Sequence, residues 1–230
     1  PYQSLLSLER AVQIWLDQPI GELASPISPE GKLDAALYGS QVAALFNQVQ
    51  LAETGADFSC TSLGNDPVGL ASPVTMRGVT AAYLFANTLV VLEVTEDVLR
   101  QTLERCAAYF TLVDGQPQIS EEFLLPKVEH YNYDYYMGVS YTYDISRPAG
   151  QRVTAMTVDR KPVADDDVFT ICLNSYRASG TGGYDCYTGC PVVREIGTEM
   201  SDLILDYFKQ YGDDIPDLRG DFQVLPAVKE

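Results

Sequence analysis

The sequence predicts an α+β fold, a layered α/β domain with mixed sheets, and three observations lead to this class. Helical and strand-like segments both occur, but they do not alternate in the strict order of a doubly wound domain. Of the 230 residues, 46% are hydrophobic, which is enough to bury a sizeable core. No internal repeat or low-complexity tract interrupts the pattern. We therefore expect one layered domain with a helical extension.

The first predicted element is an amphipathic helix from Ser4 to Asp17. Its apolar residues recur at helical spacing, and Pro19 stops it. Residues 21–32 contain two prolines and two glycines and are typical of a connection. A second helix is predicted over Leu33–Ala52, closed by a glycine, and a short strand follows over Ala56–Thr61.

The central part of the chain has the clearest pattern. Thr88–Val94 is predicted as a buried strand because it is rich in β-branched and apolar residues. Thr95 then caps a helix whose first turn is acidic, which suits the positive end of a helix dipole, and this helix runs to about Phe110. Further elements complete the domain, with strands over Gly138–Ile145, Gln151–Val158 and Val168–Asn174 and a last helix over Arg194–Gln210.

Charge and composition exclude several partners. The formal net charge of −17 repels polyanions, so a nucleic-acid polymer and an anionic membrane surface are poor partners. No run of about 18 apolar residues predicts a membrane span, and no cleavable signal peptide is evident. A start at Pro1 rather than Met indicates a piece of a longer protein.

The cysteine and histidine residues do not form a metal motif. Three cysteines lie in apolar contexts and are expected in the core, whereas Cys186 and Cys190 either stay free or bridge locally. The single histidine, His130, is interpreted as a surface or loop residue. One histidine without a Cys-x-x-Cys pair argues against zinc, so no metal ligand is predicted.

One stretch, Leu173–Tyr184, has the character of a small-molecule site. It follows a probable buried strand, and three glycines at positions 180, 182 and 183 allow close approach to the backbone. Tyr184 closes the loop with an aromatic ring. Two interpretations stay open, a binding loop or a glycine-rich turn whose tyrosine packs onto the core. The stretch is not a phosphate-binding P-loop, because no Gly-Lys-Ser/Thr follows.

Two other stretches have the same double interpretation. Phe85 and Asn87 lie at the entrance of the buried strand, where they either face a crevice or join the core. The tyrosine-rich segment 130–138 is either a binding surface or a strand with alternating buried rings.

Several motifs together resemble one known family. The resemblance covers nearly all of residues 20–212, and the motifs follow the family's order along the chain. They are Tyr-Leu-Phe-Ala-Asn-Thr-Leu at 83–89, Tyr-Asn-Tyr-Asp at 131–134, Gly-Val-Ser-Tyr at 138–141, Asp-Ile-Ser-Arg-Pro-Ala-Gly at 144–150, Leu-Asn-Ser-Tyr-Arg at 173–177 and Gly-Gly-Tyr at 182–184. This set resembles the C-terminal domain of 5′-nucleotidases, most closely the bacterial branch of 2′,3′-cyclic-nucleotide 2′-phosphodiesterase/3′-nucleotidases.

The resemblance implies that catalysis and nucleotide recognition belong to two different domains. In the family, an N-terminal calcineurin-like metallophosphatase domain carries two divalent metal ions and the catalytic residues. A linker helix, here residues 1–19, leads to the nucleotide-recognition domain, here residues 20–230. The chain has Ala86 where the branch usually has proline, and the stretch after Cys60 lacks the arginine of many classical 5′-nucleotidases.

The resemblance also assigns substrate-binding residues. It implies that the base stacks between Phe85 and Tyr184, an arrangement that tolerates every base. Asn87 and Asn174 either hydrogen-bond the ribose or base or fix their loops. Arg177 either holds its loop or meets a phosphate, and the remaining implied contacts are the backbone at Gly182 and Gly183.

These inferences lead to two alternative functions. The first is the substrate-specificity domain of a secreted, metal-dependent nucleotide phosphohydrolase that binds a nucleotide or nucleoside. By resemblance such an enzyme is extracellular, in the cell wall or in the periplasm. We expect no catalytic residue, cofactor or metal in this chain, which alone is then inactive. The second alternative is a non-catalytic cell-surface interaction module of the same fold.

Overall fold

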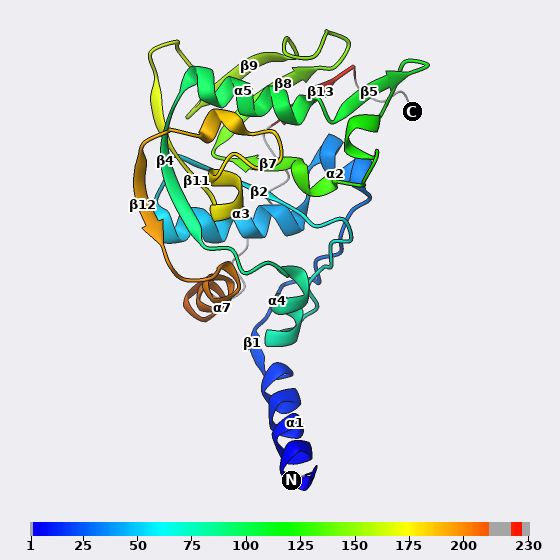
Figure 1. The fold of residues 1–230 in the computed structure, drawn as a ribbon, viewed down its shortest axis with the longest axis vertical. Coiled ribbons are helices and arrows are strands. Elements are labelled where there is room, and N and C mark those ends of the chain that lie inside the picture. The colour runs from blue at the N-terminus through cyan, green and yellow to red at the C-terminus, as the bar shows by residue number, and fades with distance from the viewer. Residues whose placement is uncertain (1, 212–221, 227–230) are drawn as a thin grey trace.

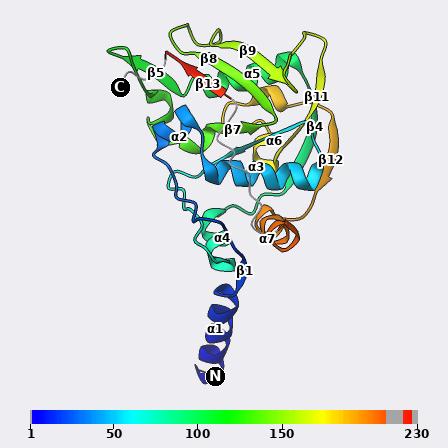
Figure 2. The same cartoon turned by 180° about the vertical axis from the view of Figure 1, so that it is seen from behind.

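The computed structural model of the chain describes residues 2–211 and 222–226. A layered body of helices and sheets carries a projecting first helix, α1 (Tyr2–Leu16), as Figures 1 and 2 both show. Arg77 of the body ties the end of α1 to α4 (Met76–Ala82) by an ion pair to Asp17 and a hydrogen bond to Gln13. The predicted α+β class is confirmed.

A five-stranded sheet lies at the centre of the body. Its strand order is β12-β4-β11-β2-β7. The strands are β2 (Phe58–Ser62), β4 (Leu89–Thr95), β7 (Asp134–Met137), β11 (Val168–Asn174) and β12 (Val192–Ile196). Strand β11 pairs antiparallel with β4 and parallel with β2, so the sheet is mixed, as expected.

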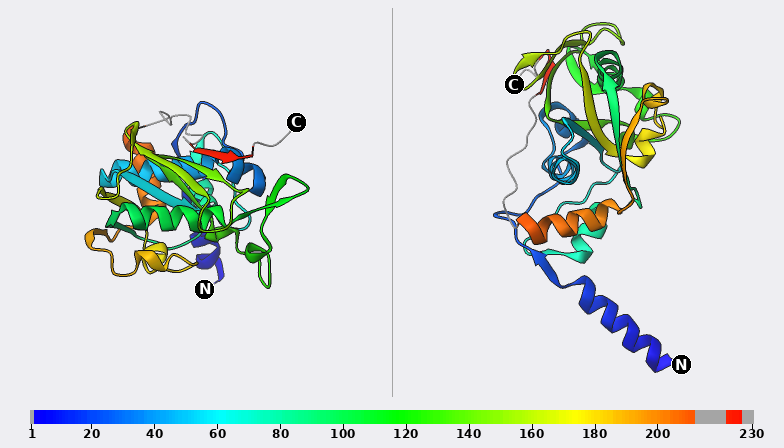
Figure 3. Two further views of the ribbon diagram at one scale, coloured as in Figure 1. Left: turned by 90° about the horizontal axis from the view of Figure 1, so that it is seen from above. Right: turned by 90° about the vertical axis from the view of Figure 1, so that its left-hand side faces the viewer.

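Helices cover one face of this sheet, and a helix and a second sheet cover the other (Figure 3). On the first face, α3 (Gln41–Thr54) packs against β2 and β7, with α7 (Met200–Tyr211) beside it. On the second face lie α5 (Glu96–Ala107) and a four-stranded sheet of order β10-β9-β8-β13. Its strands are β8 (Val139–Asp144), β9 (Val153–Val158), β10 (Lys161–Pro162) and β13 (Phe222–Leu225).

The alternation of side chains along β11 divides the core in two. Ile171 and Leu173 point into the cluster shared with α5 and the second sheet, whereas Cys172 points into the cluster under α3 and α7. All three side chains are buried, which is the expected result for a strand covered on both faces.

Short elements connect these layers and shape the surface near the cavity described below. The strands are β1 (Pro19–Gly21), β3 (Val74–Thr75), β5 (Phe110–Val113) and β6 (Gln116–Ile119). The helices are α2 (Lys32–Tyr38), α6 (Ser175–Ala178) and the 3-10 turns Glu121–Phe123, His130–Asn132 and Asp185–Tyr187.

Two predicted helices have different limits in the structure, and one strand pair was not predicted. The helix expected over Leu33–Ala52 is two helices, because Gly39 has a φ of 96° and Ser40 then caps α3. The helix expected to reach Phe110 ends at Ala107, although Thr95 caps it as predicted. The strand β5 and its partner β6 were not predicted, even though Asp114-Gly115 between them is a hairpin signal.

The last predicted helix was wrong in its first part. Residues expected to begin a helix at Arg194 belong to β12, which pairs with β4, and the helix begins only at Met200. Val192 and Val193 are exposed, so β12 lacks the alternating burial by which a strand is recognised from sequence.

The cysteines lie where the sequence analysis expected them. Cys60, Cys106 and Cys172 are buried in the core. Cys186 and Cys190 are partly exposed and are free thiols. Of the two alternatives for this pair, the structure therefore shows free cysteines and not a local disulfide.

Candidate functional site

An open cavity of about 310 Å³ lies beside the entrance of β4. Its size is at the lower end of the range for small-molecule sites in proteins, and its wall is mainly apolar and aromatic. The wall is formed by Phe46, Ser62, Leu63, Gly64, Ala82, Tyr83, Leu84, Phe85, Asn87, Lys127, Tyr131, Asn174 and Tyr176. Segments from distant parts of the chain therefore meet here.

Two exposed aromatic rings contribute to the cavity from different segments. Phe85 follows α4 and is 53% exposed, and Tyr176 lies on α6 and is 41% exposed. Large aromatic side chains are usually buried, so rings left open in the wall of a cavity are available to stack on a flat ligand. Tyr131 supplies a third ring to the same wall.

Two amide side chains flank these rings. Asn174 accepts a hydrogen bond from the backbone N–H of Arg177, at 2.8 Å, and so caps α6. The backbone carbonyl of Asn87 accepts from the N–H of Met200, at 2.9 Å. The Asn174 side chain thus fixes its loop, whereas the bond at Asn87 is made by its backbone; both residues line the cavity.

Tyr83 is a largely buried tyrosine in the wall of the cavity. Burial raises the pKa of its hydroxyl to about 12, and hydrogen bonds with Asn87 and Asn174 oppose that rise. The hydroxyl therefore stays protonated at neutral pH.

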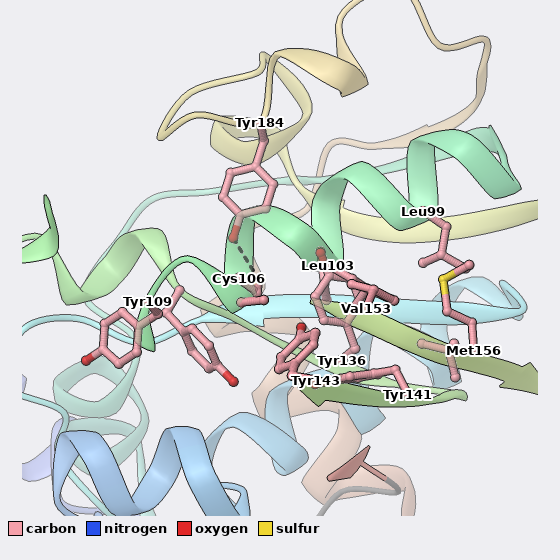
Figure 4. Packing of buried hydrophobic residues seen from close by; sticks show 14 of the residues in the cluster. Leu99, Leu103, Cys106, Tyr109, Tyr136, Tyr141, Tyr143, Val153, Met156 and Tyr184 are labelled. Atoms are coloured by element: carbon pink, nitrogen blue, oxygen red, sulfur yellow. Dashed lines mark hydrogen bonds between the residues drawn. The ribbon is translucent and has the colours of Figure 1, made fainter. Parts of the chain in front are cut away.

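The structure corrects the expectation for Tyr184. Its ring is wholly buried and belongs to the core cluster, and its hydroxyl points toward Cys106 of α5 (Figure 4). The hydroxyl lies 3.0 Å from the Cys106 Sγ and donates to the carbonyl of Asn132, also at 3.0 Å. A ring enclosed in this way cannot stack on a base, so pairing it with Phe85 was wrong.

Arg177 holds its loop and does not reach the cavity. Its guanidinium is buried and pairs with Asp134 through two contacts of 2.8 Å, Nε to Oδ2 and Nη2 to Oδ1. It also donates to the carbonyls of Thr181 and Tyr131 and lies 4.0 Å from the centroid of the Tyr184 ring. Of the two alternatives left open for this arginine, the structure shows the loop-holding one.

The charges of this buried pair depend on each other. Burial raises the pKa of the Asp134 carboxyl, while the Arg177 guanidinium opposes the rise. Burial in turn lowers the pKa of Arg177, and the carboxylate more than reverses that effect. Each charge is therefore stable in the core because the other is present.

The two predicted loop glycines also pack away from the cavity. Both have positive φ, 85° at Gly182 and 89° at Gly183. A Cβ atom on Gly182 would clash with Asn132 and Arg177, and one on Gly183 would clash with Arg105. Gly182 is needed for close packing against the buried Arg177 and Gly183 for close packing against Arg105, which corrects their assignment as ligand contacts.

Sequence reasoning overlooked Tyr176 as a candidate. The residue stands in the quoted motif, next to Arg177, on a one-turn helix. Successive helical residues point about 100° apart, so a buried Arg177 leaves Tyr176 directed outward. The adjacent positions of Tyr176 and Arg177 therefore indicate that Tyr176 points outward, but only when the burial of Arg177 is already known.

Comparisons with known proteins show which family the chain belongs to. The family model of the 5′-nucleotidase C-terminal domain matches residues 20–189. The chain belongs to this family. The match covers α5, the cavity segments and four of the five strands of the central sheet of this 5′-nucleotidase C-terminal domain, all except β12.

Curated relatives of the domain come from the branch that the motifs indicated. A 2′,3′-cyclic-nucleotide 2′-phosphodiesterase/3′-nucleotidase of Haemophilus influenzae is 31% identical over 177 residues, 67% of this chain and 26% of the relative. Its namesake from Salmonella typhimurium is 28% identical over 142 residues, 54% of this chain and 22% of the relative. The chain thus spans about a quarter of the length of these relatives.

Solved structures share the fold. A crystal structure of a putative 5′-nucleotidase from Staphylococcus aureus, in complex with alpha-ketoglutarate, has a TM-score of 0.88 and 36% identity, and covers 95% of this chain and 43% of that chain. A 5′-nucleotidase precursor from Thermus thermophilus has a TM-score of 0.75 at 21% identity, covering 98% of this chain and 43% of that one, which supports the fold alone.

The described residues contain neither a cluster of metal ligands nor a helix that could span a membrane. Among residues 2–211 and 222–226, no three His, Cys, Asp or Glu side chains gather in a group that could hold a metal ion. Over the same residues, every helix is too short or too polar to cross a membrane.

Proposed function

We propose that this domain recognises the nucleotide substrate of a metal-dependent nucleotide phosphohydrolase. The observation that carries the proposal is the open cavity with Phe85 and Tyr176 exposed in its wall. A nucleobase has two flat faces, and an aromatic ring contributes about 1–3 kcal/mol for each base that it stacks on. The base then lies between these two rings.

The amides give the cavity its polar contacts. Both Asn87 and Asn174 line the cavity, and the Asn174 side chain, already held by its bond to the Arg177 N–H, offers a hydrogen bond at little cost in side-chain entropy. Because stacking is the main term and every base has a π face, we expect adenine, guanine and pyrimidine nucleotides to bind with similar affinity. The names of the curated relatives, which act on 2′,3′-cyclic nucleotides and 3′-nucleotides, support this class of substrate.

The hydrolytic step is assigned to a different part of the protein. A two-metal site needs several carboxylate, amide and imidazole ligands, and the described residues contain no group that fits even one metal ion. We therefore place the two divalent metal ions and the catalytic residues in an N-terminal metallophosphatase domain, with residues 1–19 as the linker helix. No chemical step is assigned to residues of this chain. By the same proposal the full protein acts outside the cytoplasm, in the cell wall or periplasm.

A binding experiment with matched aromatic variants tests the proposal. Adenosine and AMP are titrated into the chain while chemical shifts are followed by NMR. We expect weak, millimolar binding of both ligands by the wild type, and a loss of about 1–3 kcal/mol, from about five-fold to over a hundred-fold in affinity, in Phe85→Ala and in Tyr176→Ala.

The control is Tyr38→Ala, since Tyr38 is 57% exposed and lies outside the cavity wall. This variant should bind as the wild type does. Absence of any shift in the wild type at the solubility limit of both ligands would refute the proposal, as would equal affinities in all three alanine variants.

A further inference from the structure

We propose that Lys127 gives the cavity a preference for phosphorylated nucleosides, by receiving the phosphate anion of a ligand whose base lies between Phe85 and Tyr176. The proposal rests on the proposed function and deepens it, because it names which chemical group of the nucleotide is read by which residue. It assigns Lys127 as a specificity-determining residue that the sequence analysis did not consider.

The composition of the cavity wall is the first observation. Among the described residues that line the cavity, Lys127 is the only one with a charged side chain. The others are apolar, aromatic, hydroxyl or amide residues, which suit a base and a sugar but leave the charge of a phosphate unbalanced. A ligand anion in this cavity would therefore have one cation within its wall.

The second observation is the placement of the ammonium group. The Lys127 Nζ lies 3.0 Å from the Tyr131 hydroxyl oxygen and 5.3 Å from the centroid of the Tyr131 ring. The hydrogen bond with Tyr131 raises the pKa of Lys127, and the charge of the Glu129 carboxylate and the hydroxyl of Tyr176 add to the same effect. Lys127 thus stands beside two of the rings that form the cavity and is charged at neutral pH.

The third observation is that this ammonium keeps bonding capacity for a ligand. It has three N–H donors, and the one hydrogen bond recorded for it within the described chain goes to the Tyr131 hydroxyl. The nearest carboxylate, Glu129, accepts from the Tyr131 hydroxyl on one oxygen and from the Asn132 amide on the other, each at 3.0 Å. Within residues 2–211 and 222–226, Lys127 takes part in no ion pair.

The charge of the whole chain makes this local cation necessary. At a formal net charge of −17, the average field around the protein disfavours an anionic ligand relative to a neutral one. Any preference for a nucleotide over its nucleoside must then come from groups within a Debye length of the phosphate. Lys127 is the group that the cavity offers.

The test is a comparison of two ligands in four proteins. Dissociation constants of AMP and of adenosine are measured by NMR titration for the wild type, Lys127→Gln, Lys127→Arg and Lys161→Gln, at low and at high salt. The last variant is a matched control, because Lys161 is an exposed lysine on β10 of the other sheet. Repeating the titration with 2′-AMP, 3′-AMP and 2′,3′-cyclic AMP shows which phosphate position Lys127 prefers.

We expect the ratio of the adenosine to the AMP dissociation constant to fall about two- to five-fold in Lys127→Gln at low salt, the size of an exposed ion pair. Adenosine binding should not change, and the ratio should be retained in Lys127→Arg and Lys161→Gln. The effect should shrink at high salt. An equal loss for AMP and adenosine in Lys127→Gln, or an unchanged ratio, would overturn the inference while leaving base stacking intact. Failure of the wild type to bind either ligand would instead refute the proposed function.

Discussion

Replacement of Arg177 by methionine tests how the buried ion pair supports the cavity. Methionine keeps much of the side-chain volume but removes the charge, and it leaves the Asp134 carboxylate without a partner in the core. Both side chains are nearly inaccessible, 2% for Arg177 and 1% for Asp134, so solvent cannot screen or rehydrate the remaining charge. Breaking a buried pair on one side costs about 3–5 kcal/mol.

The expected effect is large enough for a simple assay. For a domain of this size, a loss of 3–5 kcal/mol lowers the melting temperature by about 6–20 °C. Thermal unfolding followed by circular dichroism measures this shift. Arg147→Met is the matched control, because Arg147 pairs with Asp144 on the surface and is 54% exposed, where an ion pair contributes about 1 kcal/mol or less.

A double-mutant cycle separates the pair from the other contacts of Arg177. Asp134→Asn removes the carboxylate charge while keeping its shape, so adding it to Arg177→Met should recover more than about 1 kcal/mol relative to the sum of the single changes. An Arg177→Met protein within about 1 kcal/mol of the wild type would refute the reasoning. So would strict additivity in the cycle, since the two charges would then not depend on each other.

Two further results are expected. Tyr184→Phe should lose about 1–2 kcal/mol of stability, because the Asn132 carbonyl and the Cys106 thiol lose their hydrogen-bond partner. The variant should bind adenosine as the wild type does. Weaker binding in an NMR titration would contradict the burial of this ring. Burial lowers the pKa of Lys32 from its ordinary 10.5 to about 8, and the charge of Asp66 opposes this shift. Between pH 8 and pH 10.5 the unfolded chain therefore binds more protons than the folded chain. The contribution of Lys32 to stability rises with pH over this range. Urea unfolding should show wild type gaining on Lys32→Met from pH 8 to pH 10, and a constant or falling difference would exclude this sign.

The α+β class and several element positions could be predicted because they depend on local patterns. Strand β11 alternates between two core clusters, and the Thr95 cap marks the start of α5 through a single side chain. Local patterns gave a wrong prediction where a strand forms only because of a partner strand far away in the sequence. Strand β12 exists because β4 offers it hydrogen bonds, and the exposed Val192 and Val193 carry no alternation to reveal this.

The candidate site was also predictable from the sequence only in part. The motifs around Phe85, Asn87 and Asn174 were identified from the sequence, and the structure places all three in one cavity wall. Which tyrosine of the loop after β11 faces that cavity was not predictable. A tyrosine has an apolar ring and a polar hydroxyl, so it suits both a core and a binding surface, and its neighbours in sequence do not distinguish the two.

The sequence by itself determined the family, the fold class and the motifs from which the cavity is built. Only the tertiary structure decided that Tyr184 is enclosed and Tyr176 is open. Tyr184 is held by Cys106 and Asn132, which lie 78 and 52 positions away along the chain, and Arg177 is held by Asp134, 43 positions away. Contacts over such separations form only when the layers pack, and they set which residues after β11 face the cavity.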